Sequence, residues 1–245
     1  MKRDDLTARA PARVHGVCAG LVLLFSVFAL AAPPRAVFAA EPFRIEVVDK
    51  ENGWPVPMVE LRTTHGVRFF TDNAGVVAFD LPELRGRETW LFVDGTGYEA
   101  AKDGFGYRGV RVTPKPGESV RIKLTRTIIA QRLGRLTGAG LFAESQKLGM
   151  HKDWRESGVL GCDSVQTATH RGRHFWLWGD TTLAHYPLGV FHMSGATTGL
   201  SPFTSVKPPI RVDYRHFRDD RGRPRGVAKM PGDGLDFQAC GISLV

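Results

Sequence analysis

Short runs in which apolar and polar residues alternate follow one another from Phe43 to Leu124. Turns rich in Gly, Pro, Asp and Asn separate the seven runs, which cover residues 44–49, 57–63, 68–71, 76–81, 89–94, 107–112 and 119–124. Alternation with a period of two is typical of strands that bury one face. We therefore predict an antiparallel β-sandwich over residues 41–126, with a core that includes Ile45, Val47, Val59, Leu61, Leu91 and Val93.

The alternation stops between residues 125 and 149. Four apolar residues there fall roughly on one face of a helix, namely Ile128, Ile129, Leu133 and Leu136. Glycines at 138 and 140 then interrupt the pattern. This indicates either a short helix or an extended connector, which we place at residues 127–157 and expect to pack on the segment that follows.

A second β-rich segment begins at Gly158, and its first part predicts a hairpin. Strands at 164–170 and 174–178 flank a tight turn at residues 171–173. Asp163 precedes the first strand and Asp180 follows the second, so the two carboxylates should converge at one rim of the sheet. Trp176 and Trp178 lie beside that rim, and a carboxylate pair next to aromatic rings is typical of sites that bind or cleave sugars.

The rest of the chain predicts a second hairpin, with strands near residues 210–217 and 227–230 around a Gly/Pro turn. Four short antiparallel strands with long loops make one propeller blade or one small sheet. The predicted fold class is therefore all-β: an antiparallel β-sandwich followed by an incomplete β-propeller-like sheet at residues 158–245.

The first 39 residues have a different pattern. Four basic residues come before an unbroken apolar run at 17–32, and Val37 and Ala39 have the spacing that signal peptidase prefers. This predicts a signal peptide over residues 1–39 and a secreted or periplasmic protein that meets a membrane only through this segment. An uncleaved anchor is the alternative, although the run is shorter than the roughly 20 residues that span a bilayer.

Charge and cysteine content change this picture little. The formal charge is +8, and residues 1–39 hold five basic and two acidic side chains, which leaves +5 on the remainder. The remaining positive charge is scattered, so the sequence does not favour a nucleic acid as partner. Cys162 and Cys240 would remain after cleavage, either as a disulfide or as two buried thiols.

The motif D-x-x-x-G-x-P-V-P-x-V-x-L from Asp49 to Leu61, followed by FTDNAG at residues 70–75, resembles the carboxypeptidase regulatory-like, transthyretin-like β-sandwich. The prolines of the motif fix an extended start of a strand, and Thr71, Asp72 and Gly75 form a turn. The resemblance covers residues 41–126. It implies an accessory module that orients, spaces or binds and that lacks catalytic groups.

Residues 158–182 resemble the first blade of five-bladed propeller proteins related to glycoside hydrolases, in which a W-x-W-G-D-T run leaves the second strand. The resemblance implies that Asp163 is the base or nucleophile and that Asp180 binds sugar hydroxyls or raises the pKa of its partner. Both aspartates could instead only end strands through backbone hydrogen bonds. Five blades need more residues than follow Gly158, so we expect a truncated propeller.

Other side chains of this segment have two interpretations each. Trp176 and Trp178 could stack on a sugar ring or pack in a core between blades. His192 is a further candidate for substrate binding. No histidine spacing matches a zinc signature, and we expect neither a metal nor a cofactor.

These patterns lead to the hypothesis of an exported, carbohydrate-associated protein, a fragment of a propeller glycosidase with an accessory β-sandwich. The sequence offers no general acid, so we expect this chain by itself to be inactive as an enzyme. The alternative is a non-catalytic binding or structural module at the cell surface or in the periplasm. A non-functional gene fragment is a third hypothesis.

Overall fold

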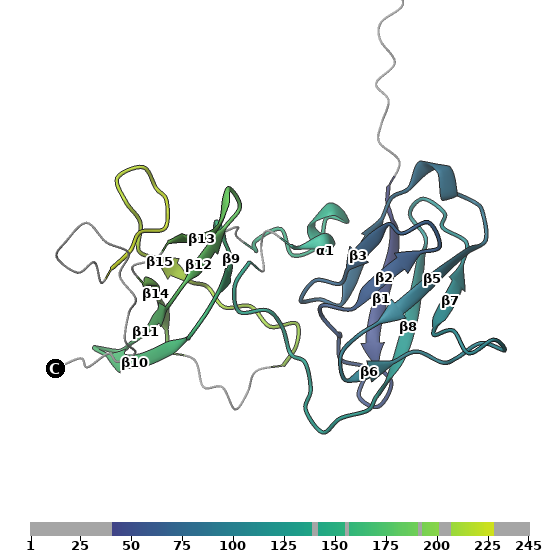
Figure 1. Ribbon diagram of the computed structural model, residues 1–245, viewed down its shortest axis with the longest axis horizontal. Helices are drawn as coiled ribbons and strands as arrows, with labels where there is room; N and C mark the ends of the chain where they lie inside the picture. Colours follow the sequence, from purple (N-terminus) through teal and green to yellow (C-terminus); the bar gives the residue numbers. More distant parts are fainter. Residues whose placement is uncertain (1–40, 139–141, 155–156, 191–192, 201–206, 228–245) are drawn as a thin grey trace, which may run out of the picture. The chain divides into compact units, whose positions relative to one another are not determined.

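The computed structural model describes residues 41–138, 142–154, 157–190, 193–200 and 207–227 (Figure 1). The predicted signal peptide, His192, Cys240 and the strand residues expected beyond Val227 lie outside these ranges. The described chain is all-β, as predicted, with four sheets, one α-helical turn and one 3₁₀ turn at Pro82–Leu84.

Two four-stranded sheets form the first half of the described chain. All seven predicted strands are present, and the pair Tyr98–Glu99 adds an eighth that is too short for alternation to mark. One sheet has the order β4-β1-β8-β6 and contains β4 (Val76–Phe79), β1 (Phe43–Asp49), β8 (Ser119–Arg126) and β6 (Tyr98–Glu99). The other has the order β3-β2-β5-β7 and contains β3 (Arg68–Phe70), β2 (Glu60–Thr63), β5 (Thr89–Asp94) and β7 (Gly109–Val112).

The core of this sandwich consists of the inward positions of both sheets. Each of the six residues predicted for it is at most 5% exposed, which confirms the faces assigned from alternation: Ile45, Val47, Val59, Leu61, Leu91 and Val93. Phe79 and Leu124 complete the same cluster, and Phe69 packs on Phe79 with ring centroids 4.9 Å apart. The first half of the described chain therefore has a hydrophobic cluster of its own.

One strand pair departs from the antiparallel pattern. β1 and β8 run in the same direction, in register from Arg44 opposite Ser119 to Asp49 opposite Leu124. The remaining pairs of the sandwich are antiparallel. The first and last long strands of the unit are thus neighbours, a pairing that no local turn signal encodes.

The TDNAG segment forms the predicted turn between β3 and β4 and is buried. The Thr71 hydroxyl accepts a hydrogen bond from the Val59 N–H at 2.9 Å and donates one to the Val56 carbonyl at 2.7 Å. Gly75 has a positive φ of 68°, and a Cβ atom there would lie 2.5 Å from the carbonyl oxygen of Val47. Only glycine fits this position without a shift of the backbone.

The connector is extended over residues 127–138, so of the two predicted alternatives the structure has the extended one. The only helix described, α1 (Glu144–Lys147), begins after the apolar residues from which a helix was considered. Two buried side chains of the TDNAG segment hold the connector. Asn73 accepts from the Arg135 N–H at 2.7 Å and donates to its carbonyl at 3.0 Å, and Asp72 accepts from the Ser145 N–H at 2.8 Å.

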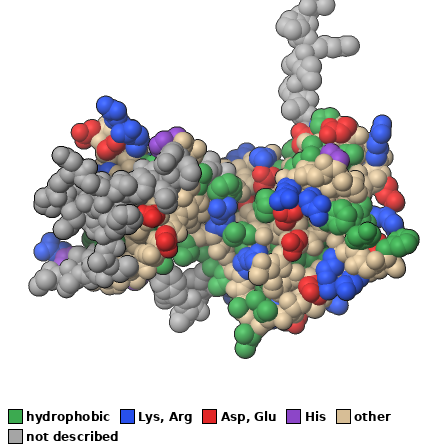
Figure 2. Space-filling view, in the orientation of Figure 1, with side chains coloured by type: hydrophobic (Ala, Val, Ile, Leu, Met, Phe, Trp, Pro, Cys, Tyr) green, Lys and Arg blue, Asp and Glu red, His purple; other side chains and the backbone are tan. Residues whose placement is uncertain are grey.

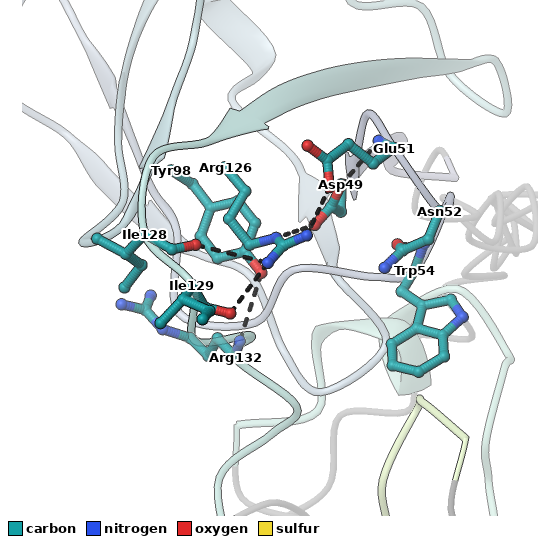
Figure 3. A network of polar contacts seen from close by, with 9 residues as sticks. All are labelled: Asp49, Glu51, Asn52, Trp54, Tyr98, Arg126, Ile128, Ile129 and Arg132. Atoms are coloured by element: carbon teal, nitrogen blue, oxygen red, sulfur yellow. Dashed lines mark hydrogen bonds and ion pairs between the residues drawn. The ribbon is translucent and has the colours of Figure 1, made fainter.

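Arg126, at the end of β8, fixes the start of the connector (Figure 3). Its Nε donates to the buried Asp49 carboxylate at 3.1 Å, and its Nη1 donates to the Ile129 carbonyl at 3.0 Å. Farther on, the Arg132 backbone N–H donates to the Tyr98 hydroxyl at 3.3 Å. The connector therefore leaves the sandwich along a defined path.

The second half contains two smaller sheets. A four-stranded antiparallel sheet has the order β10-β11-β14-β15, with β10 (Gln166–His170), β11 (Arg173–Trp178), β14 (Ser194–Gly199) and β15 (Arg215–His216). A three-stranded sheet has the order β13-β12-β9, with β13 (Tyr186–Val190), β12 (Thr181–Leu183) and β9 (Val159–Cys162). The β12–β13 hairpin is thus inserted between β11 and β14 and pairs with β9 instead.

The predicted β10–β11 hairpin is confirmed. His170 pairs with Arg173, and both turn residues between them have a positive φ, 45° at Arg171 and 74° at Gly172. Positive φ at both central positions is what a two-residue type I′ turn requires. The second predicted hairpin is shorter than expected: β15 covers two residues, and the chain returns through a bridge between Arg218 and Pro224.

Candidate functional site

The main chains of Asp163 and Asp180 lie side by side. The Asp163 N–H donates to the Asp180 carbonyl at 2.9 Å, and the Gly179 N–H donates to the Asp163 carbonyl at 2.9 Å. The Asp163 carboxylate accepts from the N–H and hydroxyl of Ser164, at 2.6 and 3.2 Å. The adjacent main chains fit a shared site, and the bond to Ser164 fits the alternative in which Asp163 only ends a strand. The catalytic roles of the two aspartates therefore stay predictions.

Trp176 and Trp178 are core residues of the four-stranded sheet. They are 7% and 2% exposed, and their rings are stacked with centroids 6.4 Å apart. The Trp176 indole N–H donates to the Thr198 hydroxyl at 2.9 Å, and the ring of Tyr214 meets both indoles edge-on. Because both faces are covered, this conformation offers neither indole to a sugar, and their predicted role in substrate binding remains untested.

A small polar cluster lies between the two sheets of this half. The hydroxyls of Thr181 and Ser194 are 2.5 Å apart and both are buried. Cys162 packs beside them and has no disulfide partner among the described residues. Burial raises the pKa of Cys162 to about 11, against an opposite effect of its hydrogen bonds to the two hydroxyls. The thiol is therefore protonated at neutral pH and is a poor nucleophile.

An open cleft of about 760 Å³ lies beside this core. Its lining comes from the end of the connector and from the chain around β15. The charged and aromatic residues of the lining are Lys152, Asp153, Trp154, Arg211, Asp213, Tyr214, Arg215, His216 and Arg218. A volume of this size is in the range of small-molecule sites. The described residues that we predicted for a site do not line this cleft: Asp163, Asp180, Trp176 and Trp178. His192 lies outside the described residues.

Arg211 organises the acidic side of the cleft. Its guanidinium makes a two-point contact with the Asp213 carboxylate, at 2.6 and 2.8 Å, and also contacts Asp153. Arg218 donates to the carbonyl oxygens of Ser157 and Gly222, at 3.1 and 2.6 Å. Both carboxylates of the lining are thus engaged by one arginine, and Arg218 is held by neutral groups.

Tyr214 and His216 form the wall between the cleft and the tryptophan pair. The His216 ring lies 5.5 Å from that of Trp178, and burial lowers the pKa of His216 to about 4, so the ring is neutral at pH 7. Burial also raises the pKa of Tyr214. Neither the Tyr214 hydroxyl nor either His216 nitrogen has a hydrogen-bond partner among the described residues.

The sequence pattern did not single out these two residues. The alternation of VDYRHF predicted a strand there, but nothing local showed that its inward rings would meet Trp178 on one side and a cleft on the other. The only local signal is a tyrosine and a histidine two residues apart in a predicted strand, which would place both side chains on one face.

The outer face of the β3-β2-β5-β7 sheet carries a second feature, which we call the aromatic strip: Trp90, Phe92 and Tyr107. Neighbouring rings of the strip meet edge-on, with centroids 6.1 and 5.8 Å apart. Arg62 lies over Phe92 and Arg111 over Trp90, at 4.7 and 5.7 Å. Figure 2 shows hydrophobic side chains beside Lys and Arg on the sandwich surface in this view.

The space for Trp90 depends on a glycine. Gly109 lies opposite Phe92 on β7, and a Cβ atom at this glycine would come within 2.6 Å of the Trp90 ring. The indole therefore lies flat over the neighbouring strand. A ring-shaped ligand that stacked on this indole would take the place of Arg111, which lies over it.

The described residues lack two features that would bear on function. They contain no group of three or more His, Cys, Asp or Glu side chains that could hold a metal ion. They also contain no helix that is long and apolar enough to span a membrane. Comparison with family models, curated proteins and solved structures finds no match to this chain.

Proposed function

We propose that this chain is an exported, carbohydrate-associated protein that binds a saccharide in the cleft beside β15. The β-sandwich would be an accessory module of the carboxypeptidase regulatory-like type, and the second half the start of a propeller-like unit. The strands of the β10-β11-β14-β15 sheet pair in chain order, apart from the inserted β12–β13 hairpin, and this order supports the propeller-like interpretation, since a blade is a four-stranded meander.

The observation that carries the proposal is the combination of groups around the cleft. Sugars are recognised by planar charged groups that bind pairs of hydroxyls and by polar groups fixed against an apolar wall. Arg211 with Asp213 supplies the first, and Tyr214 and His216, backed by the tryptophan pair, supply the second. Both His216 nitrogens lack a partner and are themselves buried, so a ring turned toward the cleft would offer a hydroxyl a donor and an acceptor.

Binding of the full chain to a panel of neutral and acidic polysaccharides tests the proposal. His216→Phe keeps the ring but removes both nitrogens, and we expect it to weaken binding about tenfold, the effect of losing a hydrogen bond in a buried setting. His65→Phe, at an exposed turn of the sandwich, is the matched control and should bind as the parent chain does. Failure of the parent chain to bind any saccharide of the panel would refute the proposal.

A second candidate function places saccharide binding on the sandwich. The aromatic strip favours it, because its rings are partly exposed and Tyr107 is 58% exposed. Tyr107→Ala should then abolish binding that His216→Phe leaves intact. The opposite result would assign binding to the cleft.

A hydrolytic function would rest on Asp163 and Asp180. Their adjacent main chains support a shared role, and the resemblance to propeller glycosidases supplies the chemistry, with Asp163 as the base or nucleophile. Asp163→Asn and Asp180→Asn variants tested on the same polysaccharides would separate the two hypotheses. Release of reducing ends by the parent chain, lost in both variants, would indicate an enzyme.

A further inference from the structure

The charges of the cleft are unbalanced. Four cationic side chains line it, Lys152, Arg211, Arg215 and Arg218, against only two carboxylates, Asp153 and Asp213. His216 adds no charge at neutral pH, because burial keeps its ring neutral. The lining therefore has a formal charge of +2.

The excess charge belongs to two exposed side chains. Arg211 takes up both carboxylates, and Arg218 donates to backbone carbonyls. Lys152 and Arg215 have no carboxylate partner among the described residues, although both line the cleft. Cations that face a concave surface attract anions more strongly than isolated surface charges do, because the walls exclude part of the water.

The wall of the same cleft holds an independent sign of a ligand. His216 is 9% exposed, and neither of its nitrogens has a partner among the described residues. A buried polar group without a partner is costly, so such groups are found where a ligand or water supplies the missing hydrogen bond. Because both nitrogens are themselves buried, a ligand hydroxyl would bond to them once the ring turns toward the cleft. Lys152 and Arg215, which are exposed, suit an anion.

We propose that the ligand of the cleft is an acidic saccharide, whose anionic group lies at Lys152 and Arg215 and whose hydroxyls reach His216. The proposal deepens the proposed function and rests on it. A uronate carboxylate and a sulfate ester share the required chemistry, since each accepts charge-assisted hydrogen bonds from ammonium and guanidinium groups.

Calorimetry on the full chain with paired probes tests the inference. The pairs are oligogalacturonate with its methyl ester, and dextran sulfate with dextran, so that the members of each pair share a sugar backbone and only one of them carries the anionic group. We expect the acidic member of at least one pair to bind about tenfold more tightly, and the pair that shows the difference identifies carboxylate or sulfate as the group. Raised salt should reduce the difference.

Two double variants test whether the preference for the acidic probe depends only on the net charge of the protein. Lys152→Gln combined with Arg215→Gln should remove the preference for the acidic probe. Lys123→Gln combined with Arg171→Gln removes the same charge from exposed positions outside the cleft and should leave the preference intact. Equal loss in both double variants would overturn the inference, because binding would then follow total charge.

The remaining outcomes distinguish the two proposals. Equal affinity for acidic and neutral members of both pairs would overturn the acidic ligand but keep saccharide binding. No binding of any probe, by a chain shown to be folded by circular dichroism, would overturn both.

Discussion

Gly75 is a residue at which the sandwich tolerates little change. Its φ of 68° is unfavourable for other residues, and the carbonyl of Val47, which a side chain would strike, belongs to the central strand β1. Gly75→Ala should therefore lower the free energy of unfolding by about 3 kcal/mol, from backbone strain and the clash together. Urea denaturation of the full chain measures this.

Gly66 is a matched control for that substitution. It also has a positive φ, 92°, but no atom lies within 4 Å of the position of its absent Cβ. Gly66→Ala should cost only the backbone strain, about 1 kcal/mol. An equal decrease in the free energy of unfolding of the two variants would show that the contact with Val47 does not contribute to the effect of Gly75→Ala.

His216 makes stability depend on pH. Its pKa is lowered from 6.5 to about 4 in the folded chain, mainly by burial and secondarily by Arg218. Below pH 6.5 the unfolded chain takes up a proton that the folded chain refuses until about pH 4, so stability should fall as the pH drops through this window. The loss should reach about 2 kcal/mol, with allowance for partial screening by solvent.

The comparison with His216→Phe isolates this effect from the titration of carboxylates. The variant should show a smaller decline between pH 7 and pH 4.5, and at pH 7 it should be as stable as the parent or slightly more so, because two unpartnered polar atoms are removed. Parallel pH profiles of parent and variant would contradict the assignment.

At the scale of elements, Asn73 joins the sandwich to the connector. Its buried amide binds both backbone groups of Arg135, so Asn73→Ala would leave those groups without their partner. We expect a loss of about 2 kcal/mol in the free energy of unfolding. Asn52→Ala, which removes one exposed turn bond to Trp54, should cost well below half of that.

Hydrogen exchange distinguishes a local from a global effect of this substitution. If the amide serves to fix the connector, the Arg135 N–H should lose protection in Asn73→Ala while the strands of the sandwich keep theirs. Uniform loss of protection would mean that Asn73 stabilises the turn of the sandwich and not its junction.

Elements defined by nearest neighbours in the chain could be predicted from the sequence. The strands around Ile45 and Leu91 follow from alternation, and the hairpin at Gly172 follows from its turn, because both signals lie within a few residues. The extended connector was one of two alternatives, since the spacing of Ile128 and Leu133 fits a helix but packing against the sandwich decides otherwise.

At the scale of the whole molecule, the sequence was informative only where long-range contact follows from a short turn. The adjacency of Asp163 and Asp180 in the main chain is such a case, because one hairpin brings them together. The cleft is not, since it joins Lys152 and Arg215 across more than sixty positions of the sequence. Burial of Trp176 and Trp178 also depends on a distant partner, Tyr214.

The parallel pairing of β1 and β8 has a mechanical consequence. The chain enters the sandwich at one end of β1 and leaves at the opposite end of β8, so tension on the flanking segments pulls the two strands past each other. In that direction the rungs of the ladder share the force and must break together, whereas strands pulled apart from one end open one rung at a time. Such a unit should therefore resist stretching along the chain more strongly than one in which β1 and β8 ran antiparallel.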